Sequence, residues 1–260
     1  MGDFSTYPRR RVGFQVEYEG TDFVGWQDQG ERFPTIQGTL ERALSSFFKV
    51  PVHVSGSSRT DAGVHARSQV AAISFTHPIE LAGLEKVINS RLPNTISVRE
   101  IRPVHEDFFP RHAVKQKTYR YAMYTSRWQR PLIDKFATRT GHTLCVESMQ
   151  AAAQSLVGTH DFKSFAASDH QGHTTIRTLV SLSVHDLGEQ KVCFEVTGTG
   201  FLKQMVRNLV GSLVEVGRGH RHTEWIQEVL SARHRTAAGP TAHARGLNLW
   251  QSEVDWHHGE

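Results

Sequence analysis

The stretch Val12-Gly13-Phe14-Gln15-Val16-Glu17-Tyr18 alternates apolar residues with polar or small ones at a period of two. Such alternation predicts a β-strand with one buried face. Farther along the chain, apolar residues recur every three to four positions over 36–47. This spacing predicts a helix that starts after Pro34, with Thr35 as its N-cap. The chain therefore opens with a strand followed by a helix.

The next elements extend this pattern. Val52 and Val54 begin a predicted short strand, and residues 70–75 form a second β-like run after a loop at 55–67. The remaining predicted elements are a helix at 81–92 and a strand at 96–101. The order βαββαβ is that of the ferredoxin-like unit, an antiparallel sheet with two helices on one face, which is also the scaffold of many RNA-recognition modules.

The second part of the chain repeats this order with one extra helix. Its predicted elements are a strand at 117–124, a helix at 147–157 ended by Gly158, a hairpin of strands at 177–186 and 191–197, helices at 201–216 and 223–233, and a strand at 247–254. The polar stretch at 103–111 is the predicted boundary. We therefore predict an α+β fold of two ferredoxin-like (RRM-like) halves, 1–108 and 109–260, whose antiparallel sheets join around a central basic cleft.

The composition indicates a globular chain without a membrane span. Hydrophobic residues make up 38% of the 260 positions, which is enough for a packed core. No stretch of about 18 apolar residues is present to cross a bilayer. Arg9, Arg10 and Arg11 are followed by Gln15 and Glu17 instead of the apolar region of an export signal, so we expect none.

The two cysteines, Cys145 and Cys193, have no CxxC spacing. We therefore expect neither a disulfide framework nor a thiolate zinc site, and the reduced cytoplasm is the predicted location.

Positive charge is concentrated in one window. The formal net charge of the chain is +4, whereas the window 111–140 holds eight cations against one acid, Asp134. The cations are Arg111, Lys115, Lys117, Arg120, Arg127, Arg130, Lys135 and Arg139, and the aromatic residues between them are Tyr119, Tyr121, Tyr124 and Trp128. Cations beside flat rings favour nucleic-acid binding. The alternative is a solvated strand edge whose tyrosines pack in a core.

The loop from Ser55 to Ala66 is the best candidate for chemistry. Its small residues allow sharp turns and close approach to a ligand, and Arg59 and Asp61 are the groups in it that could hold charge. From the residues alone, an ordinary Asx turn at Asp61-Ala62-Gly63 explains the stretch equally well.

The string Arg59-Thr60-Asp61-Ala62-Gly63-Val64-His65-Ala66 resembles the catalytic loop of the tRNA pseudouridine synthase A family. Further motifs resemble that family in the same order along the chain. They are Tyr18-Glu19-Gly20-Thr21 with Phe23, Gly25-Trp26-Gln27 and Thr35-Ile36-Gln37-Gly38; Lys117-Thr118-Tyr119-Arg120-Tyr121; Gly158-Thr159-His160-Asp161-Phe162; Gly200-Phe201-Leu202 with Met205-Val206-Arg207-Asn208; and Ala244-Arg245-Gly246-Leu247. The chain departs from the family pattern at Ser58, where glycine is usual, and at Pro110 and His112.

This resemblance implies an enzyme that isomerises uridine to pseudouridine at positions 38, 39 and 40 of the tRNA anticodon stem-loop. It implies no cofactor or metal, and it implies a homodimer. It assigns Asp61 as the catalytic carboxylate, Arg207 as its ion-pair partner, Tyr119 as the ring that stacks on the uracil, and Arg59 as the group that assists base flipping. The predicted substrate-binding residues are Arg59, Tyr119, Lys115, Lys117, Arg120 and Lys203, with Lys203 on the same helix as Arg207.

Three other interpretations compete with this one. A non-catalytic RNA-binding protein with tandem RRM-like halves is the main alternative, but a carboxylate at Asp61 would repel phosphate in a basic groove. His160-Asp161 could suggest a hydrolase dyad, but no nucleophile-elbow sequence accompanies it. The sixteen histidines include three close pairs but no HExxH motif, so we expect no metal site. The pairs are His170 and His173, His220 and His222, and His257 and His258.

Overall fold

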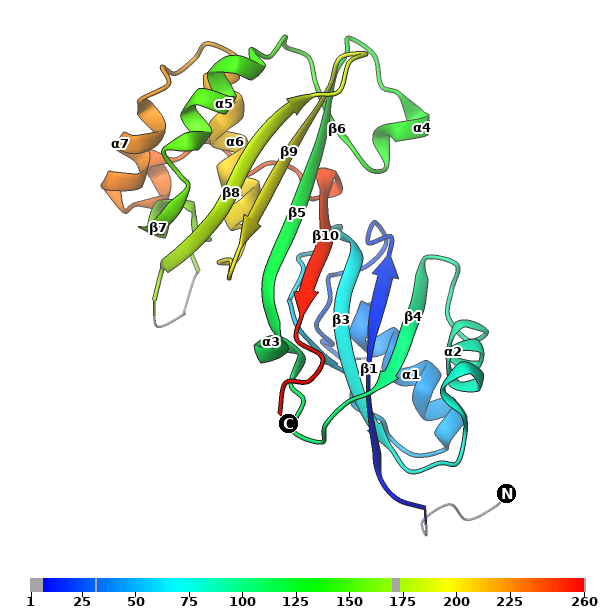
Figure 1. Cartoon of the computed structure of the whole chain (residues 1–260). Helices are drawn as coiled ribbons and strands as arrows, with labels where there is room; N and C mark the ends of the chain where they lie inside the picture. Colours follow the sequence, from blue (N-terminus) through cyan, green and yellow to red (C-terminus); the bar gives the residue numbers. More distant parts are fainter. Residues whose placement is uncertain (1–6, 31, 170–173, 260) are drawn as a thin grey trace. The chain divides into compact units, whose positions relative to one another are not determined.

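The computed structural model describes residues 7–30, 32–169 and 174–259. It divides into two compact units, of which the first comprises Met1–Lys115 with Leu249–Glu260 and the second comprises Gln116–Asn248 (Figure 1). These units differ from the predicted ranges 1–108 and 109–260, because the residues from Leu249 onward pack with the first unit.

The first unit follows the predicted order of strands and helices. Its elements are β1 (Arg10–Tyr18), α1 (Ile36–Phe48), β2 (Ser55–Gly56), β3 (His65–Phe75), α2 (Leu81–Asn89), β4 (Ile96–Pro103) and the short helix α3 (Pro110–Ala113). Strand β1 lies antiparallel between β3 and β4, and β2 pairs with β3. The Thr35 hydroxyl accepts a hydrogen bond from the Gly38 amide, which confirms the predicted N-cap of α1.

Strand β3 is the centre of the first unit. Val70 and Ala72 pack with Phe108, Ala113 and Val114 in a buried cluster. The alternate side chains of the same strand are also buried, so β3 has two covered faces. A strand that is covered on both faces does not alternate apolar and polar residues, so the sequence does not mark where it begins. For this reason the prediction starts the strand at residue 70, whereas β3 begins at His65.

The predicted strand at Val52 and Val54 is wrong, although both side chains are buried. The Val52 amide donates to the Ser45 hydroxyl, and the Val54 amide donates to the Glu41 carboxylate. Since side chains of α1 take these backbone groups, they are not paired with a strand. The paired residues come later, at Ser55–Gly56.

The second unit holds a mostly antiparallel sheet with helices. Its strands are β5 (Val114–Thr125, within this unit from Gln116), β6 (Thr138–Thr140), β7 (Gly158–Asp161), β8 (Ile176–Asp186) and β9 (Lys191–Gly198). Strand β9 lies antiparallel between β5 and β8, β7 pairs with β8, and the short β6 runs parallel to β5. The predicted order lacks β6 and β7, because three or four residues carry too little periodicity to detect.

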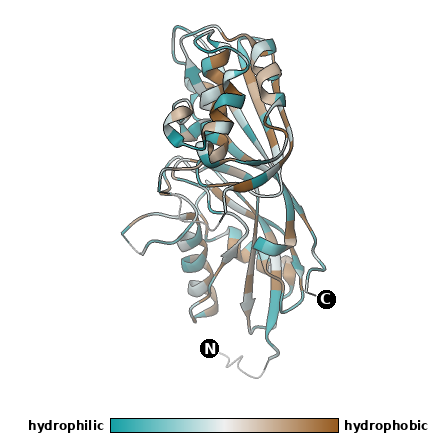
Figure 2. Ribbon diagram, turned by 90° about the vertical axis from the view of Figure 1, so that its left-hand side faces the viewer, coloured by the Kyte–Doolittle hydropathy of each residue, from teal (hydrophilic) through white to brown (hydrophobic). Residues whose placement is uncertain are grey.

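The helices of the second unit are α4 (Pro131–Asp134), α5 (Val146–Gln154), α6 (Met205–Gly217) and α7 (Trp225–Ala232), with 3-10 turns at Lys163–Phe165, Arg235–Ala237 and Ala244–Gly246. Most residues of α6 are buried, with α5 beside it (Figure 1). Figure 2 shows hydrophobic and hydrophilic residues along the same helices. The last strand, β10 (Leu247–Val254), joins the first unit from Leu249.

Helix α6 starts later than predicted. Gln204 has a φ of 60°, in the left-handed region, so the helix begins at Met205 and not at Phe201. The prediction that Lys203 and Arg207 share one helix is therefore wrong. No helix in the described part of the chain has both the length and the apolar character needed to cross a membrane.

Candidate active site

A buried threonine anchors the loop that connects β2 to β3. The Thr60 hydroxyl lies 2.8 Å from the Tyr18 hydroxyl, and the Thr60 carbonyl accepts from the Trp26 amide at 3.1 Å. The two neighbours of Thr60 in the sequence point the other way: Arg59 is exposed and Asp61 is partly exposed. The anchor therefore fixes the backbone while Arg59 stays exposed and Asp61 stays partly exposed.

A glutamine of β3 holds the start of this loop. The Gln69 side chain is fully buried, donates to the Ser58 carbonyl at 2.6 Å and accepts from the Ser57 hydroxyl at 2.8 Å. The Ser57 amide also donates to the Val70 carbonyl at 2.9 Å. These bonds satisfy the polar groups that the loop buries, so this part of the loop is held in one conformation.

The Asp61 backbone closes a tight turn at the end of the loop. The Val64 amide donates to the Asp61 carbonyl at 3.2 Å, and Gly63 has a φ of 75°. A positive φ at the third position of such a turn favours glycine. The closing bond of this turn uses the main-chain oxygen of Asp61.

Two glycines of the opening motif allow the chain to pack directly on this loop. A Cβ at Gly25 would lie 2.6 Å from the Thr60 carbonyl oxygen, and one at Gly20 would lie 2.0 Å from the Val64 carbonyl oxygen. No side chain fits in either space. The opening motif is therefore the scaffold of the Asp61 loop, a role that the resemblance did not assign.

Tyr119 lies on β5 in the second unit. Its ring is 7% exposed and packs edge-to-face on Phe201, with ring centroids 4.9 Å apart. Tyr121 lies two residues farther along the same face and is fully buried. Its hydroxyl donates to the His243 carbonyl at 2.8 Å and lies 2.8 Å from the Thr138 hydroxyl. Burial raises the pKa of Tyr121 to about 12, so this phenol is neutral.

Arg207 lies in the first turn of α6 and is bound to the segment 238–242. Its Nε donates to the Ala242 carbonyl at 2.8 Å, and the Ala242 amide donates to the Arg207 carbonyl at 3.1 Å. Burial lowers the pKa of His243, and the charges of Arg245 and Arg207 lower it further. Arg207 thus shares an environment with Tyr121 and His243.

Three of the predicted RNA-binding cations have carboxylate partners. The ion pairs are Lys115 with Asp255 at 3.5 Å, Arg120 with Glu195 at 2.6 Å, and Lys203 with Asp169 at 2.6 Å. Strand alternation places Arg120 on the face of β5 opposite Tyr119, whereas Lys117 shares the face of Tyr119. The structure therefore separates Arg120 from the tyrosine with which the prediction grouped it.

The four residues assigned to the reaction are divided between the units. Arg59 and Asp61 belong to the first, and Tyr119 and Arg207 belong to the second. The ion pair between Asp61 and Arg207 stays a prediction.

The residues that a hydrolase or a disulfide-bonded protein would use have other roles in the structure. The His160 ring bonds to the Val157 carbonyl at 3.0 Å, whereas the Asp161 carboxylate accepts from the Thr175 hydroxyl and the Lys163 amide. They therefore form no hydrolase dyad. Cys145 and Cys193 are free thiols.

The described residues contain no group of three histidine, cysteine or acidic side chains that could hold a metal ion. His220 and His222 each lie near a glutamate, and the candidate pair His170 and His173 lies outside the described residues.

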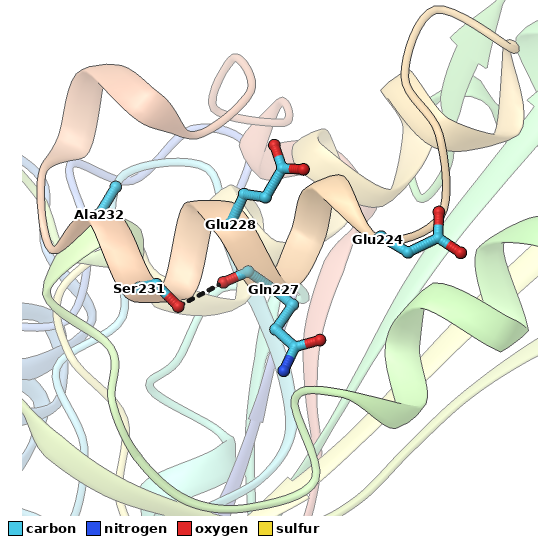
Figure 3. Close-up of a pocket in the computed structure, with 5 residues that line it drawn as sticks. All are labelled: Glu224, Gln227, Glu228, Ser231 and Ala232. Carbon is cyan, nitrogen blue, oxygen red and sulfur yellow. Dashed lines mark hydrogen bonds between the residues drawn. The ribbon is translucent and has the colours of Figure 1, made fainter.

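A shallow pocket on α7 contains none of the predicted site residues. It is lined by Glu224, Gln227, Glu228, Ser231 and Ala232 (Figure 3). Its two carboxylates would repel a polyanion such as RNA. The candidate site therefore stays with the Asp61 loop and with the Tyr119 and Arg207 region.

Comparison with known proteins identifies the family. A family model described as tRNA pseudouridine synthase matches residues 15–111 and 152–255. The chain belongs to this family. A tRNA pseudouridine synthase A of Myxococcus xanthus is 42% identical over 239 residues, which cover 92% of this chain and 90% of that protein. Proteins of the same name from Enterobacter sp. (strain 638) and Halalkalibacterium halodurans are 38% and 40% identical, covering 96% and 94% of this chain and 92% and 93% of their own lengths.

Membership of the tRNA pseudouridine synthase family confirms the resemblance seen in the sequence. Since this family consists of isomerases, the chain is an enzyme. The matched ranges include the Asp61 loop and Arg207 but not Tyr119.

Proposed function

We propose that this chain isomerises uridine to pseudouridine at positions 38, 39 and 40 of the tRNA anticodon stem-loop. One observation carries the proposal: the loop fixed by buried Thr60 leaves Arg59 exposed and Asp61 partly exposed, in a chain that belongs to the family over most of its length. The names of the relatives support tRNA as the substrate.

The reaction breaks the glycosidic bond between N1 and C1′ of uridine and forms a bond between C5 and C1′. The hydrogen on C5 leaves as a proton and N1 gains one, so the reaction needs no redox partner. One carboxylate suffices as nucleophile or base at the sugar, and we assign this role to Asp61. Attack at C1′, attack at C6 and removal of the 2′ hydrogen to give a glycal are the three routes, and the proposal favours the glycal.

The other residues have supporting roles. A guanidinium beside a carboxylate favours the ionised form, and we assign this role to Arg207. The Tyr119 ring, held edge-on by Phe201, stacks on the displaced uracil. The target base must leave its helical stem before it reacts, and the exposed Arg59 fills the space that it leaves.

We further propose that the protein is a cytoplasmic homodimer and that each chain has two ferredoxin-like halves around a basic cleft. The order β1-α1-β2-β3-α2-β4 of the first unit supports the ferredoxin-like description. Lys117 on the Tyr119 face supports the basic surface, together with Lys115 and Lys203 if phosphates replace their carboxylate partners, whereas Arg120 lies on the opposite face of β5.

The test is to incubate the protein with unmodified tRNA transcripts and to map pseudouridine at base resolution. We expect product at positions 38 to 40. Asp61→Asn should bind tRNA like the parent but lose at least about a thousandfold in single-turnover rate, because the reaction loses its nucleophile or base. The control is Glu253→Gln, which removes an exposed carboxylate of the same unit. Turnover by Asp61→Asn within tenfold of the parent would refute the assignment, and binding without product by the parent would favour the non-catalytic alternative.

A further inference from the structure

We propose that Asn208, Arg235 and Thr241 are positioning residues that orient the Arg207 guanidinium by fixing the segment 238–242 on α6. The inference rests on the role of Arg207 in the proposed function. The family resemblance gave no role to any of the three.

Asn208 is the centre of a buried polar network. It follows Arg207 on α6 and its side chain is fully buried. Its amide nitrogen donates to the Phe165 carbonyl at 2.8 Å, and its amide oxygen accepts from Thr241 Oγ1 at 2.7 Å and from Arg235 Nη2 at 3.1 Å. Both ends of the amide are therefore used, which fixes the side chain in one orientation.

Arg235 connects this amide to the segment. Its Nη1 donates to the Gly239 carbonyl at 2.9 Å and its Nη2 donates to Thr241 Oγ1 at 2.9 Å. Its partners in the described structure are carbonyl, amide and hydroxyl oxygens. The planar guanidinium holds these acceptors in a fixed arrangement, which a lysine ammonium cannot reproduce.

Small residues bring the segment into direct contact with the helix. A Cβ at Gly211 would lie 1.7 Å from the Pro240 carbonyl oxygen, and one at Gly239 would lie 2.9 Å from the Ser212 Cα. The Gly239 amide also donates to the Ser212 hydroxyl at 2.9 Å. The segment therefore lies on α6 with no side chain between them, and its position follows that of the network.

The segment ends at Arg207 itself. The Ala242 carbonyl accepts from Arg207 Nε at 2.8 Å, and the next carbonyl, that of His243, accepts from the Tyr121 hydroxyl. A bond at Nε sets the plane of the guanidinium, because Nε lies in that plane. Movement of the segment would rotate Arg207 without removing its charge.

The test uses Thr241→Val, which removes one hydroxyl from the network and keeps the shape of the side chain. In single-turnover reactions at saturating enzyme, we expect the rate of pseudouridine formation to fall about tenfold, as a small misplacement of a catalytic group does. The dissociation constant for tRNA should stay within about twofold of the parent, since the network touches no RNA in the proposal. Thr241→Ser restores the hydroxyl and should restore the rate. The control Thr178→Val makes the same substitution at a partly exposed threonine, whose hydroxyl bonds to Thr159, and should leave the rate unchanged.

Coupling to Arg207 separates positioning from general stability. In an Arg207→Lys background, Thr241→Val should change the rate by less than about twofold, because the guanidinium that Thr241 helps to orient is absent. Equal losses in both backgrounds, or no loss in the parent, would overturn the proposal. If Arg207→Lys alone reacts at the parental rate, the role of Arg207 in the proposed function is refuted, and the role of the network with it. If Arg207→Lys is slow but Thr241→Val reacts at the parental rate, only the role of the network is refuted.

A second variant covers the case in which Thr241→Val unfolds at the assay temperature. Arg235→Lys keeps the charge but loses the planar arrangement of donors. We expect the same rate loss and the same dependence on Arg207, with melting curves recorded for each protein. An Arg235→Lys enzyme that melts like the parent and reacts at the parental rate would overturn the proposal.

Discussion

The Asp61 loop and the segment 238–242 are both irregular stretches beside residues assigned to the reaction, but they are fixed by different means. The loop is held by glycine contacts, by buried hydroxyls and by Gln69, all without charge. The segment also has glycine contacts and a bond to a serine hydroxyl, but in addition the charged side chains of Arg207 and Arg235 bond to its carbonyls. Neutral anchors fix a loop without burying an ionised group. A charged anchor buries part of its guanidinium, and oxygen acceptors must replace the water that the guanidinium loses.

Gly25→Ala is the largest change expected in the loop. Its Cβ would meet the Thr60 carbonyl and its φ of 103° is strained for alanine, so we expect a loss of about 3 kcal/mol in the free energy of unfolding. Urea denaturation measures it. The control is Gly30→Ala, which has a φ of 88° but no atom within 4 Å of its Cβ, and it should lose only about 1 kcal/mol. Equal losses would mean that the close contact with Thr60 contributes nothing.

Arg59→Ala tests what the loop leaves exposed. If Arg59 fills the gap behind an extruded uridine, its loss should raise the activation free energy at a paired stem uridine by up to about a few kcal/mol. The increase should be much smaller at a uridine opposite a mismatch. Single-turnover rates at saturating enzyme on the two RNAs decide the matter. An equal fold loss on both would exclude the flipping role, and Asp61→Asn should abolish both reactions alike.

The same substitution in the two units compares their anchors directly. Tyr121→Phe removes a hydroxyl bonded to the His243 carbonyl and to Thr138, so it should cost about 2 kcal/mol of unfolding free energy, whereas Tyr18→Phe removes the hydroxyl bonded to Thr60 and should cost about 1 kcal/mol. Thermal or urea unfolding of both variants gives the comparison. A larger cost for Tyr18→Phe would reverse this ranking of the two anchors.

A pH series gives the smallest expected effect. The pKa of Tyr121 rises on folding from 10.0 to about 12, so its contribution to stability is complete below pH 10 and is lost as the pH rises toward 12. Between pH 9 and pH 11, the free energy of unfolding of the parent should fall by about 1 kcal/mol more than that of Tyr121→Phe. The measurement is urea unfolding of both proteins at the two pH values. Parallel losses would mean that Tyr121 ionises equally in both states.

Local patterns in the sequence predict much of this fold. The alternation of β1 and the threonine before α1 act over a few residues, and both predictions are confirmed. Val52 and Val54 mislead because their alternation is that of a strand, while side chains of α1 take their amides. The late start of α6 depends on one left-handed residue, Gln204, for which the sequence gives no signal.

The site divides in the same way. Arg59 and Asp61 are predicted from a contiguous motif. Gln69 bonds to the Ser58 carbonyl and Thr241 bonds to the Asn208 side chain, and both partners are distant in sequence, so no local pattern reveals these two residues. The position of Arg120 opposite Tyr119 follows from strand alternation alone and could have been predicted.

The return of residues from Leu249 to the first unit has a consequence for synthesis of the protein. On the ribosome, β3 emerges long before the residues that complete its surroundings. The Ser252 hydroxyl donates to the Ser68 carbonyl at 2.6 Å, and Val254 and Trp256 pack on the cluster around Val70. Strand β10 is the neighbour of β3 in the sheet, so until those last residues are translated the nascent chain exposes apolar surface and unpaired backbone on β3. Such features recruit chaperones or promote aggregation. Folding of the first unit is thus completed only after the second unit has been synthesised.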